Sequence, residues 1–490
     1  MIRDLLLNCT DRNRIAVMER TRNTTYLELV KQTEMVRGQL PLQTRAHIAI
    51  FLPDGGSYIA ALFAVYMAGM TAFPLNSRLT RHEIMPLLKQ ASVSVVLTSG
   101  LFRELWGSIG EEMETLTVID VDDIPDCGHS IQTPVRPADP DQPMLMLTTS
   151  GTTGKAKIVM LSERNFEHSV LAYIDKMDFE SRPEEETKFV MGTPLSAIYG
   201  LMVLTACLIK SFPIVILGDV FTLDMFYKVV EEHRVTHYEG GVSVGLMMEQ
   251  MAGRPIPYDI SSLRYFGVAG SKITGDTLLR LIEAYPGTEY WPGYGMTEAS
   301  PLISKPYKKV RKDKLDSVGT VIRGMTVMLD VDGILTDKPY IRGEVVAKGP
   351  NIMMGYYENE EETRRIIKDG YLYTGDIGYF DEDGYLYLCG RKKNVIMTRG
   401  FSVYAEEIEA CIMNSRLVKD CVVYGEQDTF GNEVVCADLV LRFPDIQMSD
   451  IHLYCQEHLS GYKQPQRLKI VDEIKKTVTG KIERPAKAET

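Results

Sequence analysis

Residues 147–157, LTTSGTTGKAK, have the composition of a phosphate-binding loop. Hydroxyls can donate hydrogen bonds, glycines let backbone N–H groups approach a ligand closely, and a lysine adds positive charge. The P-loop of nucleotide hydrolases is not matched, because Thr149 stands where that motif has its first glycine and Ala156 where it has Ser or Thr. A plain surface turn has the same composition, so both interpretations stay open. The residues concerned are Thr149, Ser150, Gly151, Thr152, Thr153, Gly154 and Lys155.

Two further segments carry residues that could act beside such a loop. YWPGYGMTEAS (290–300) holds Glu298, which as a lone loop glutamate would be solvated but near phosphates is a candidate Mg²⁺ ligand. YLYTGDIGYFDEDGYLYLCGRKKN (371–394) offers Asp376, which we expect on a tight turn, where it could cap the turn or accept hydrogen bonds from two ribose hydroxyls. Residues 381–384 predict only a hairpin turn.

The segment KKTVTGKIERP (475–485) places Lys481 after a Thr-Gly step near the C-terminus. A lysine in such a position is ordinary when it is considered alone. The order and spacing of this segment relative to the other segments make Lys481 a candidate functional residue.

Together, LTTSGTTGKAK, YGMTE, YTGDIG, GRKKN and TVTGKI resemble the motifs of the adenylate-forming superfamily: acyl-CoA synthetases, luciferases and peptide-synthetase adenylation domains. The stretches YMAGMTAFPLN, TPLSAIYG, VAGSKI and RGEVVAKGPNIMMGYY agree, so the resemblance spans nearly the whole chain and is most like AMP-forming acyl-CoA synthetases. It implies that a carboxylate attacks the α-phosphate of ATP, releasing pyrophosphate, and that a thiol then attacks the acyl-adenylate. ATP, Mg²⁺ and either coenzyme A or a phosphopantetheine arm are the cofactors and co-substrates implied.

The resemblance also implies roles for the matching residues. Residues 149–155 would hold the β- and γ-phosphates, Glu298 the Mg²⁺ and Thr297 the α-phosphate, while Lys481 would bridge carboxylate and phosphate. Such positioned charges stabilise the negative charge that develops in the transfer. The nucleoside would be held by Tyr294 stacked on adenine, by Gly270 and Ser271 opposite it, and by Asp376 with Arg391 at the ribose.

The acid pocket and the hinge are also expected from the resemblance. Lys393, two residues after the arginine of the GR pair, would be the pivot of the small domain, although a solvated linker lysine is the alternative. The acid pocket would include Ala197, Tyr199, Gly240, Gly241, Val268 and Met296.

Several departures from the family pattern fall near this pocket. Ser196 and Ala197 replace a common Phe-His pair, YEGGVSV lacks the usual proline, and Lys272 and Ala405 replace other common prolines. These departures bear on which acid is bound more than on the reaction that is catalysed. With glycines at 240 and 241 we expect a roomy pocket, suited to a medium or bulky acyl or aryl acid rather than acetate.

The elements that must position these residues are those of an α/β protein. Residues 26–40 and 57–70 read as helices, alternating with apolar strands at 47–52, 93–98, 213–217 and 264–268. Residues 144–147 and 157–161 predict strands flanking the loop, with Ser162 capping the next helix. We expect a large multi-layer N-terminal domain (1–390) with an appended β-rich subdomain, its turns at 332–333 and 342–343, and a small, mobile α+β C-terminal domain (391–490).

The composition limits the setting and the partners. The 490-residue chain is 45% hydrophobic and 24% charged, and its formal net charge of −12 disfavours a nucleic-acid surface. Its eight cysteines show no metal-like spacing, which favours a reducing cytoplasm. The uncharged stretches 55–77 and 189–209 are broken by prolines and glycines, so we expect buried helix and strand rather than membrane spans.

Three functions remain from the sequence. The first is ligation of a small-molecule carboxylic acid to coenzyme A. The second is a stand-alone enzyme that loads the phosphopantetheine of a carrier protein. The third is a non-catalytic nucleotide-binding homologue, which the set Lys155, Glu298, Asp376 and Lys481 disfavours.

Overall fold

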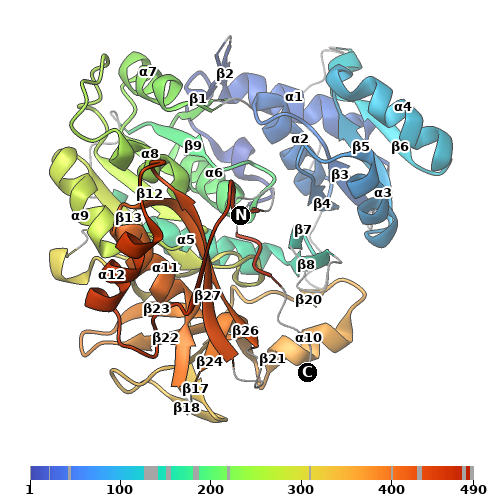
Figure 1. Cartoon of the computed structure of the whole chain (residues 1–490). Coiled ribbons are helices and arrows are strands. Elements are labelled where there is room, and N and C mark those ends of the chain that lie inside the picture. The colour runs from blue at the N-terminus through green and yellow to red at the C-terminus, as the bar shows by residue number, and fades with distance from the viewer. Residues whose placement is uncertain are drawn as a thin grey trace.

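The computed structural model describes residues 2–20, 22–41, 46–125, 142–149, 156–179, 187–217, 221–307, 311–398, 401–427, 433–476 and 482–485. Two sheets and the helices around them make up its larger part (Figure 1). The first sheet runs in the order β13 (Glu289–Pro292), β12 (Tyr265–Ala269), β11 (His237–Gly241), β9 (Phe189–Gly192), β10 (Ile214–Ile216), β1 (Ile15–Met18), β2 (Asn23–Thr25). The second runs in the order β20 (Gly355–Tyr356), β8 (Lys157–Leu161), β7 (Leu145–Thr149), β4 (Thr71–Pro74), β3 (His47–Ile50), β5 (Val93–Thr98), β6 (Thr117–Asp120).

Helices separate the sheets and cover their outer faces. The main core joins both sheets through α1 (Tyr26–Gln39), α2 (Gly56–Met67), α5 (Glu163–Met177) and α6 (Ile198–Lys210). The outer face of the first sheet packs on α7 (Leu223–His233), α8 (Val242–Gln250) and α9 (Gly275–Ala284). The outer face of the second packs on α3 (Arg81–Gln90) and α4 (Arg103–Glu112). The expected α/β layering is confirmed.

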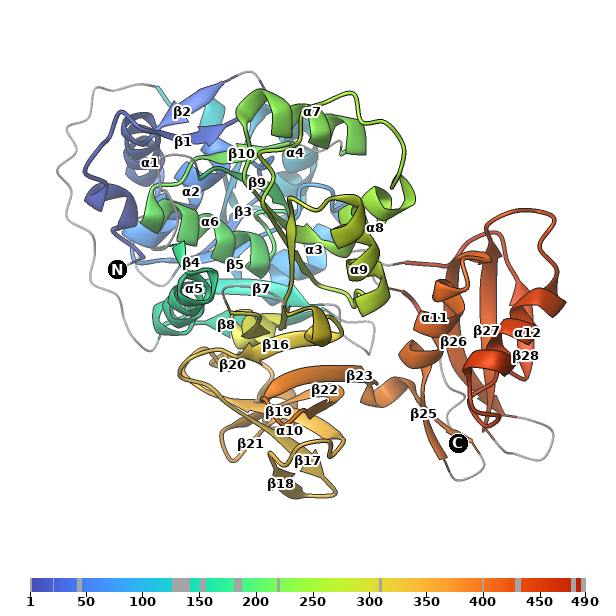
Figure 2. The same cartoon turned by 90° about the vertical axis from the view of Figure 1, so that its left-hand side faces the viewer.

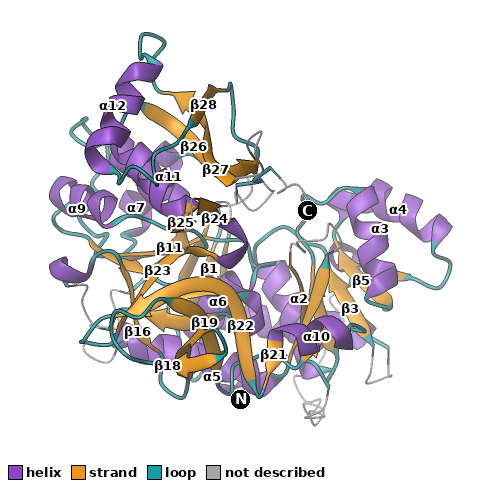
Figure 3. Cartoon of the chain, turned by 60° about the horizontal axis from the view of Figure 1, so that its bottom comes forward, coloured by secondary structure: helices purple, strands orange, loops and turns teal. Residues whose placement is uncertain are grey.

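A β-rich subdomain follows these layers, and Figure 3 shows it as almost entirely strand. Its sheet contains β14 (Tyr294–Gly295), β15 (Leu302–Lys305), β16 (Ser317–Val321), β23 (Tyr385–Arg391), β22 (Tyr371–Phe380), β19 (Gly343–Lys348), β17 (Thr326–Val331), β18 (Ile334–Thr336) and, paired with β22, β21 (Ile367–Lys368). The helix α10 (Glu360–Ile366) precedes β21.

One turn in the subdomain differs from the expectation. The turn at 332–333 is confirmed, but Gly343 is the first residue of β19 and the second turn lies at 339–340. There Tyr340 adopts φ +60°, and its N–H donates to the carbonyl of Phe380 at 2.7 Å. This tertiary hydrogen bond, not glycine, places the turn.

The remaining residues form a small α+β unit with its own core, which extends from Ile396 to Cys455. Its elements are β24 (Val395–Thr398), β25 (Phe401–Tyr404), α11 (Ala405–Asn414), β26 (Val418–Gln427), β27 (Glu433–Leu441), α12 (Met448–His458) and β28 (Arg467–Ile470). Figure 2 shows it to one side of the layers, next to α8 and α9. Asn414 bonds Asp276 of α9 at 2.8 Å, and Arg416 pairs with Glu249 of α8 at 3.3 Å.

The two uncharged stretches are part of the packed core. Residues 56–74 form α2 and β4, and residues 189–210 form β9 and α6. Among the helices of the described residues, none has the length and apolar character needed to cross a bilayer.

Candidate active site

The expected strand–loop–strand element is present. Strands β7 and β8 are antiparallel, with Thr149 opposite Lys157, and the Ser162 side chain caps α5 by accepting from the N–H of Asn165. Residues 150–155 lie outside the described residues. On the far side of β8, Tyr356 of β20 pairs with Val159, so residues 353–357 lie directly beside the strand that leaves the loop.

Glu298 is tied to this same segment. It lies in the short 3₁₀ turn Thr297–Ala299 and is only 7% exposed. Its Oε1 accepts a hydrogen bond from the hydroxyl of Tyr356 at 2.8 Å, and its carbonyl accepts from the N–H of Met353 at 2.9 Å. The predicted metal ligand and the predicted phosphate loop therefore meet through β20. Tyr356 is not among the predicted site residues, although it lies in the recognised stretch RGEVVAKGPNIMMGYY.

Charged neighbours surround the ring of Tyr356. The ammonium of Lys157 lies 5.3 Å from the ring centroid and pairs with Glu362. Burial, and then the Glu298 carboxylate, raise the pKa of Tyr356, so its hydroxyl remains protonated and donates. The hydrogen bond from Arg365 lowers the pKa of Glu362, which keeps the partner of Lys157 ionised.

The loop that carries Thr297 and Glu298 is closed by a backbone contact. The N–H of Met296 donates to the carbonyl of Pro301 at 2.9 Å. A Cβ at Gly295 would lie 2.0 Å from that same carbonyl oxygen, so only glycine allows this approach. The glycine of YGMTE therefore has a packing reason, and Thr297 and Glu298 are held next to one another at the end of β14.

Asp376 contacts two other residues that are also expected at the nucleoside, Arg391 and Tyr294. It faces Arg391 across β22 and β23, with Oδ1 at 2.7 Å from Arg391 Nε, and its Oδ2 accepts from the hydroxyl of Tyr294 at 2.7 Å. Burial, and then the nearby Asp376, raise the pKa of Tyr294 well above its ordinary value. The expectation of a tight turn at Asp376 is wrong, because the residue lies within β22, after Gly375 at φ +73°.

The neighbouring segments end at the same edge of the first sheet. Val268 lies on β12, level with Gly240 of β11 and Pro292 of β13. Gly270, at φ +86°, and Ser271 follow β12, and the ammonium of Lys272 donates to the carbonyl of Leu388 on β23 at 3.3 Å. The loop after β12 is thus held against the strand that carries Arg391.

The expected acid pocket is less roomy at Gly240 than its sequence indicates. A Cβ there would lie 2.1 Å from the hydroxyl of Tyr238, so the tyrosine already fills the space that the glycine leaves. At Gly241 the nearest atom to such a Cβ is 3.9 Å away. Ala197 is the N-cap of α6, and Tyr199 lies in its first turn.

The two remaining predicted residues belong to the C-terminal part. Lys481 lies outside the described residues, next to a bridge between Lys476 and Ile482. Lys393 lies in the 3₁₀ turn Lys392–Asn394, directly after β23, and Lys392 of that turn pairs with Glu344 at 2.7 Å. The expected hinge therefore connects the β-rich subdomain with the small unit.

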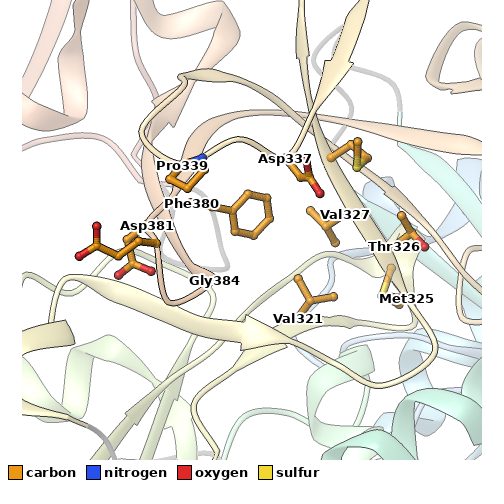
Figure 4. Close-up of a pocket in the computed structure, with 11 residues that line it drawn as sticks. Val321, Met325, Thr326, Val327, Asp337, Pro339, Phe380, Asp381 and Gly384 are labelled. Carbon is orange, nitrogen blue, oxygen red and sulfur yellow. The ribbon is translucent and has the colours of Figure 1, made fainter.

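A pocket of about 420 Å³ lies elsewhere (Figure 4). It opens in the β-rich subdomain, where Phe380 and Val321 provide apolar lining and Asp337 and Asp381 acidic lining. Asp381 there accepts from the N–H groups of Asp383 and Tyr385, which confirms the hairpin turn at 381–384. Among the residues that the structure describes, no predicted site residue lines this pocket.

Comparisons with known proteins agree with this geometry. The model of the AMP-binding enzyme family matches residues 8–357, and that of the AMP-binding enzyme C-terminal domain matches residues 407–481. A 2-succinylbenzoate–CoA ligase of Bacillus pumilus (strain SAFR-032) is 27% identical, over 96% of this chain and 94% of its own. A long-chain-fatty-acid–CoA ligase of Bacillus subtilis (strain 168) is 27% identical, over 90% and 85%.

Solved structures are similar over the full length. O-succinylbenzoate CoA synthetase from Bacillus subtilis, in complex with the acyl-adenylate intermediate OSB-AMP, has a TM-score of 0.85 at 25% identity, covering 100% of this chain and 99% of its own. ATP-bound MatB from Rhodopseudomonas palustris has a TM-score of 0.88 at 23% identity, covering 98% and 96%, and so supports the fold.

Proposed function

The chain belongs to the AMP-binding enzyme family, and from this we propose that it ligates a small-molecule carboxylic acid to coenzyme A at the expense of ATP. In the first step a carboxylate oxygen of the acid bonds to the α-phosphorus, and pyrophosphate leaves. In the second the sulfur of coenzyme A bonds to the acyl carbon, its proton is lost, and AMP leaves. The convergence of Glu298, Tyr356 and β8 supports this proposal, since a carboxylate that could bind Mg²⁺ is tied through Tyr356 to the strand that follows the proposed phosphate loop.

In this proposal Thr149 and residues 150–155 bind the β- and γ-phosphates. Asp376 and Arg391 bind the ribose, and Tyr294 packs on adenine. The paired arrangement of Asp376 and Arg391 supports the second assignment, because a buried carboxylate so oriented can accept from vicinal hydroxyls. Thr297 and Lys481 act at the α-phosphate, where positive charge and hydrogen-bond donors lower the barrier.

Glu298 fits a Mg²⁺ site. Tyr356 holds Oε1, while Oε2 has no hydrogen-bond partner among the described residues, so one hard oxygen remains for a cation. The described residues contain no cluster of three or more His, Cys, Asp or Glu able to hold a metal. That matches Mg²⁺ on a nucleotide, which takes one or two carboxylates and completes its shell with phosphate oxygens and water. Bound there, Mg²⁺ would neutralise charge on the phosphates.

We also propose the domain boundary at residues 390 and 391 and a cytoplasmic setting. The separate core from Ile396 onward supports the boundary. The seven cysteines within the described residues are all free thiols, as expected in a reducing compartment.

The experiment is ATP–pyrophosphate exchange screened over a library of carboxylic acids, followed by thioester detection with coenzyme A and with a carrier protein. Exchange that requires one acid, then thioester on coenzyme A, is expected. Thioester on the carrier protein alone would instead identify a carrier-loading enzyme. Nucleotide binding without exchange for any acid would identify a non-catalytic homologue.

Glu298→Gln tests the metal assignment in the same assay. The change removes an anionic ligand with little change in volume, so Mg²⁺-dependent exchange should be lost while the fold is kept. Glu361→Gln, an exposed change on α10, is the control. Full exchange by Glu298→Gln would contradict the assignment.

A further inference from the structure

A buried carboxylate stands directly beside the expected acid pocket. Glu239 of β11 immediately precedes Gly240 and Gly241 and is 1% exposed. Its Oε1 accepts from the hydroxyl of Tyr173 at 2.7 Å, and its Oε2 accepts from the hydroxyl of Tyr199. Tyr199 is itself an expected pocket residue, so the Glu239 carboxylate is in direct contact with a residue of the expected pocket.

A buried ammonium completes this cluster. Lys305 of β15 is 1% exposed, and its Nζ lies 3.5 Å from Glu239 Oε1 and 5.4 Å from the ring centroid of Tyr173. We call these four residues the Glu239 cluster: Tyr173, Tyr199, Glu239 and Lys305.

The fold itself does not require charge at this place. The neighbouring strands of the sheet bury mostly apolar and aromatic side chains, and a buried ion pair is often no more stable than an apolar replacement. The sequence also makes room for the carboxylate, since a Cβ at Gly267 would lie 1.8 Å from Glu239 Oε2. Because the fold gains little from charge here, the charged pair is a candidate for substrate recognition at the expected pocket.

The hydrogen-bond count indicates what the cluster could recognise. Glu239 already accepts from two hydroxyls and is approached by an ammonium. Lys305 has three N–H donors, and Glu239 is the partner it has among the described residues, at a long 3.5 Å. Lys305 therefore has N–H donors without a partner among the described residues, whereas both oxygens of Glu239 already accept hydrogen bonds.

We propose that the Glu239 cluster recognises the end of the substrate remote from the activated carboxylate, and that this end carries a hydrogen-bond acceptor, a carbonyl or carboxylate oxygen, rather than an alkyl group. An alkyl end would leave the donors of Lys305 unpaired in a dehydrated site, which is costly. This recognition specifies the class of acid that is activated, and it rests on the proposed function.

The test compares acids of equal length in ATP–pyrophosphate exchange: pentanoate with 4-oxopentanoate and pentanedioate, and hexanoate with 5-oxohexanoate and hexanedioate. A site that hydrogen-bonds its substrate strongly rejects analogues lacking the group. The parent protein should prefer an oxo acid or diacid over its alkyl counterpart by at least about ten-fold in kcat/KM.

Two variants assign that preference to the cluster. Glu239→Gln with Lys305→Met removes both charges at once, which avoids leaving one unpaired buried ion, and should reduce the ratio to less than about three-fold. Lys176→Met removes another buried ammonium, which binds Thr320 opposite Lys305, and should keep the parent ratio. An alkyl preference in the parent protein, or an unchanged ratio in the double variant, would overturn this inference while leaving acid activation intact. Absence of exchange with every acid would overturn the activation as well.

Discussion

The hydroxyl of Tyr356 donates to Glu298 Oε1 over 2.8 Å, although the two residues are 58 positions apart. Tyr356 is also paired with Val159 of β8, the strand that follows the proposed phosphate-binding loop. The carboxylate is therefore oriented from β20, the strand that pairs with β8. A tyrosine that bonds one carboxylate oxygen would fix the orientation of the carboxylate and leave its other oxygen for a cation.

Tyr356→Phe keeps the ring and removes the donor. We expect apparent Mg²⁺ affinity to fall about ten-fold or more, because partners that orient a metal ligand usually contribute that much. The measurements are the Mg²⁺ dependence of exchange and calorimetric titration of Mg²⁺ with ATP. Tyr357→Phe is the control, since Tyr357 packs its ring on His47. Identical Mg²⁺ curves for the two variants would contradict the positioning role.

Lys481→Ala separates the two half-reactions. Loss of a charge directed at the transition state should slow adenylation by about a hundred-fold or more. Thioester formation from chemically prepared acyl-adenylate should continue at the parent rate, because the α-phosphate is already bonded to the acyl group. Lys475→Ala, at an exposed lysine of the same segment, should change neither step. A loss of both half-reactions in Lys481→Ala would refute the assignment.

The sequence predicted local elements well. The strand at 93–98, the strand at 157–161 and the Ser162 cap depend on side chains close in the chain, and the structure has them at those residues. Each expected site residue lies in a recognisable motif, and the roles assigned to these residues remain predictions. Asp376 and Arg391 do meet, since β22 and β23 form a hairpin.

What the sequence could not predict depends on contacts between distant segments. Gly240 is a different case, because the side chain that fills the space beside it belongs to Tyr238, two residues earlier on the same strand, and the sequence interpretation overlooked it. The link from Tyr356 to Glu298 joins β20 to the turn between β14 and β15, and the link from Lys305 to Glu239 joins two different sheets. Only the stacking of the layers brings these partners together.

Lys176 gives a pH dependence of stability. Burial lowers its pKa from 10.5 to about 8, while its ammonium binds Thr320. Between pH 8 and 10.5 the unfolded chain therefore binds more protons at this residue than the folded chain, so its contribution to the free energy of unfolding rises with pH. Urea denaturation of the parent and Lys176→Met from pH 7.5 to 9.5 should show the parent gaining relative to the variant. A difference that is constant with pH would contradict the lowered pKa.

Lys393 is the proposed pivot of the small unit. Its 3₁₀ turn lies between Arg391 and β24, and Arg391 is paired with Asp376. Beyond the turn, Asn414 contacts α9 and Arg416 contacts α8. Adenylation needs Lys481 at the carboxylate and the α-phosphate, whereas the second step needs a thiol to reach the acyl carbon of that carboxylate, so one rigid arrangement is a poor solution. Large domain rotations are absorbed by a few backbone dihedrals, and proline fixes φ near −65°.

Lys393→Pro should therefore retain pyrophosphate exchange while thioester formation falls by at least about ten-fold, the converse of Lys481→Ala. Lys393→Ala removes the charge without restricting the backbone and should retain both steps, which distinguishes a pivot from a solvated linker charge. Equal damage to both steps by the proline, or none, would mean that the small unit does not turn at this residue, and the two-arrangement mechanism would have to be abandoned for this protein.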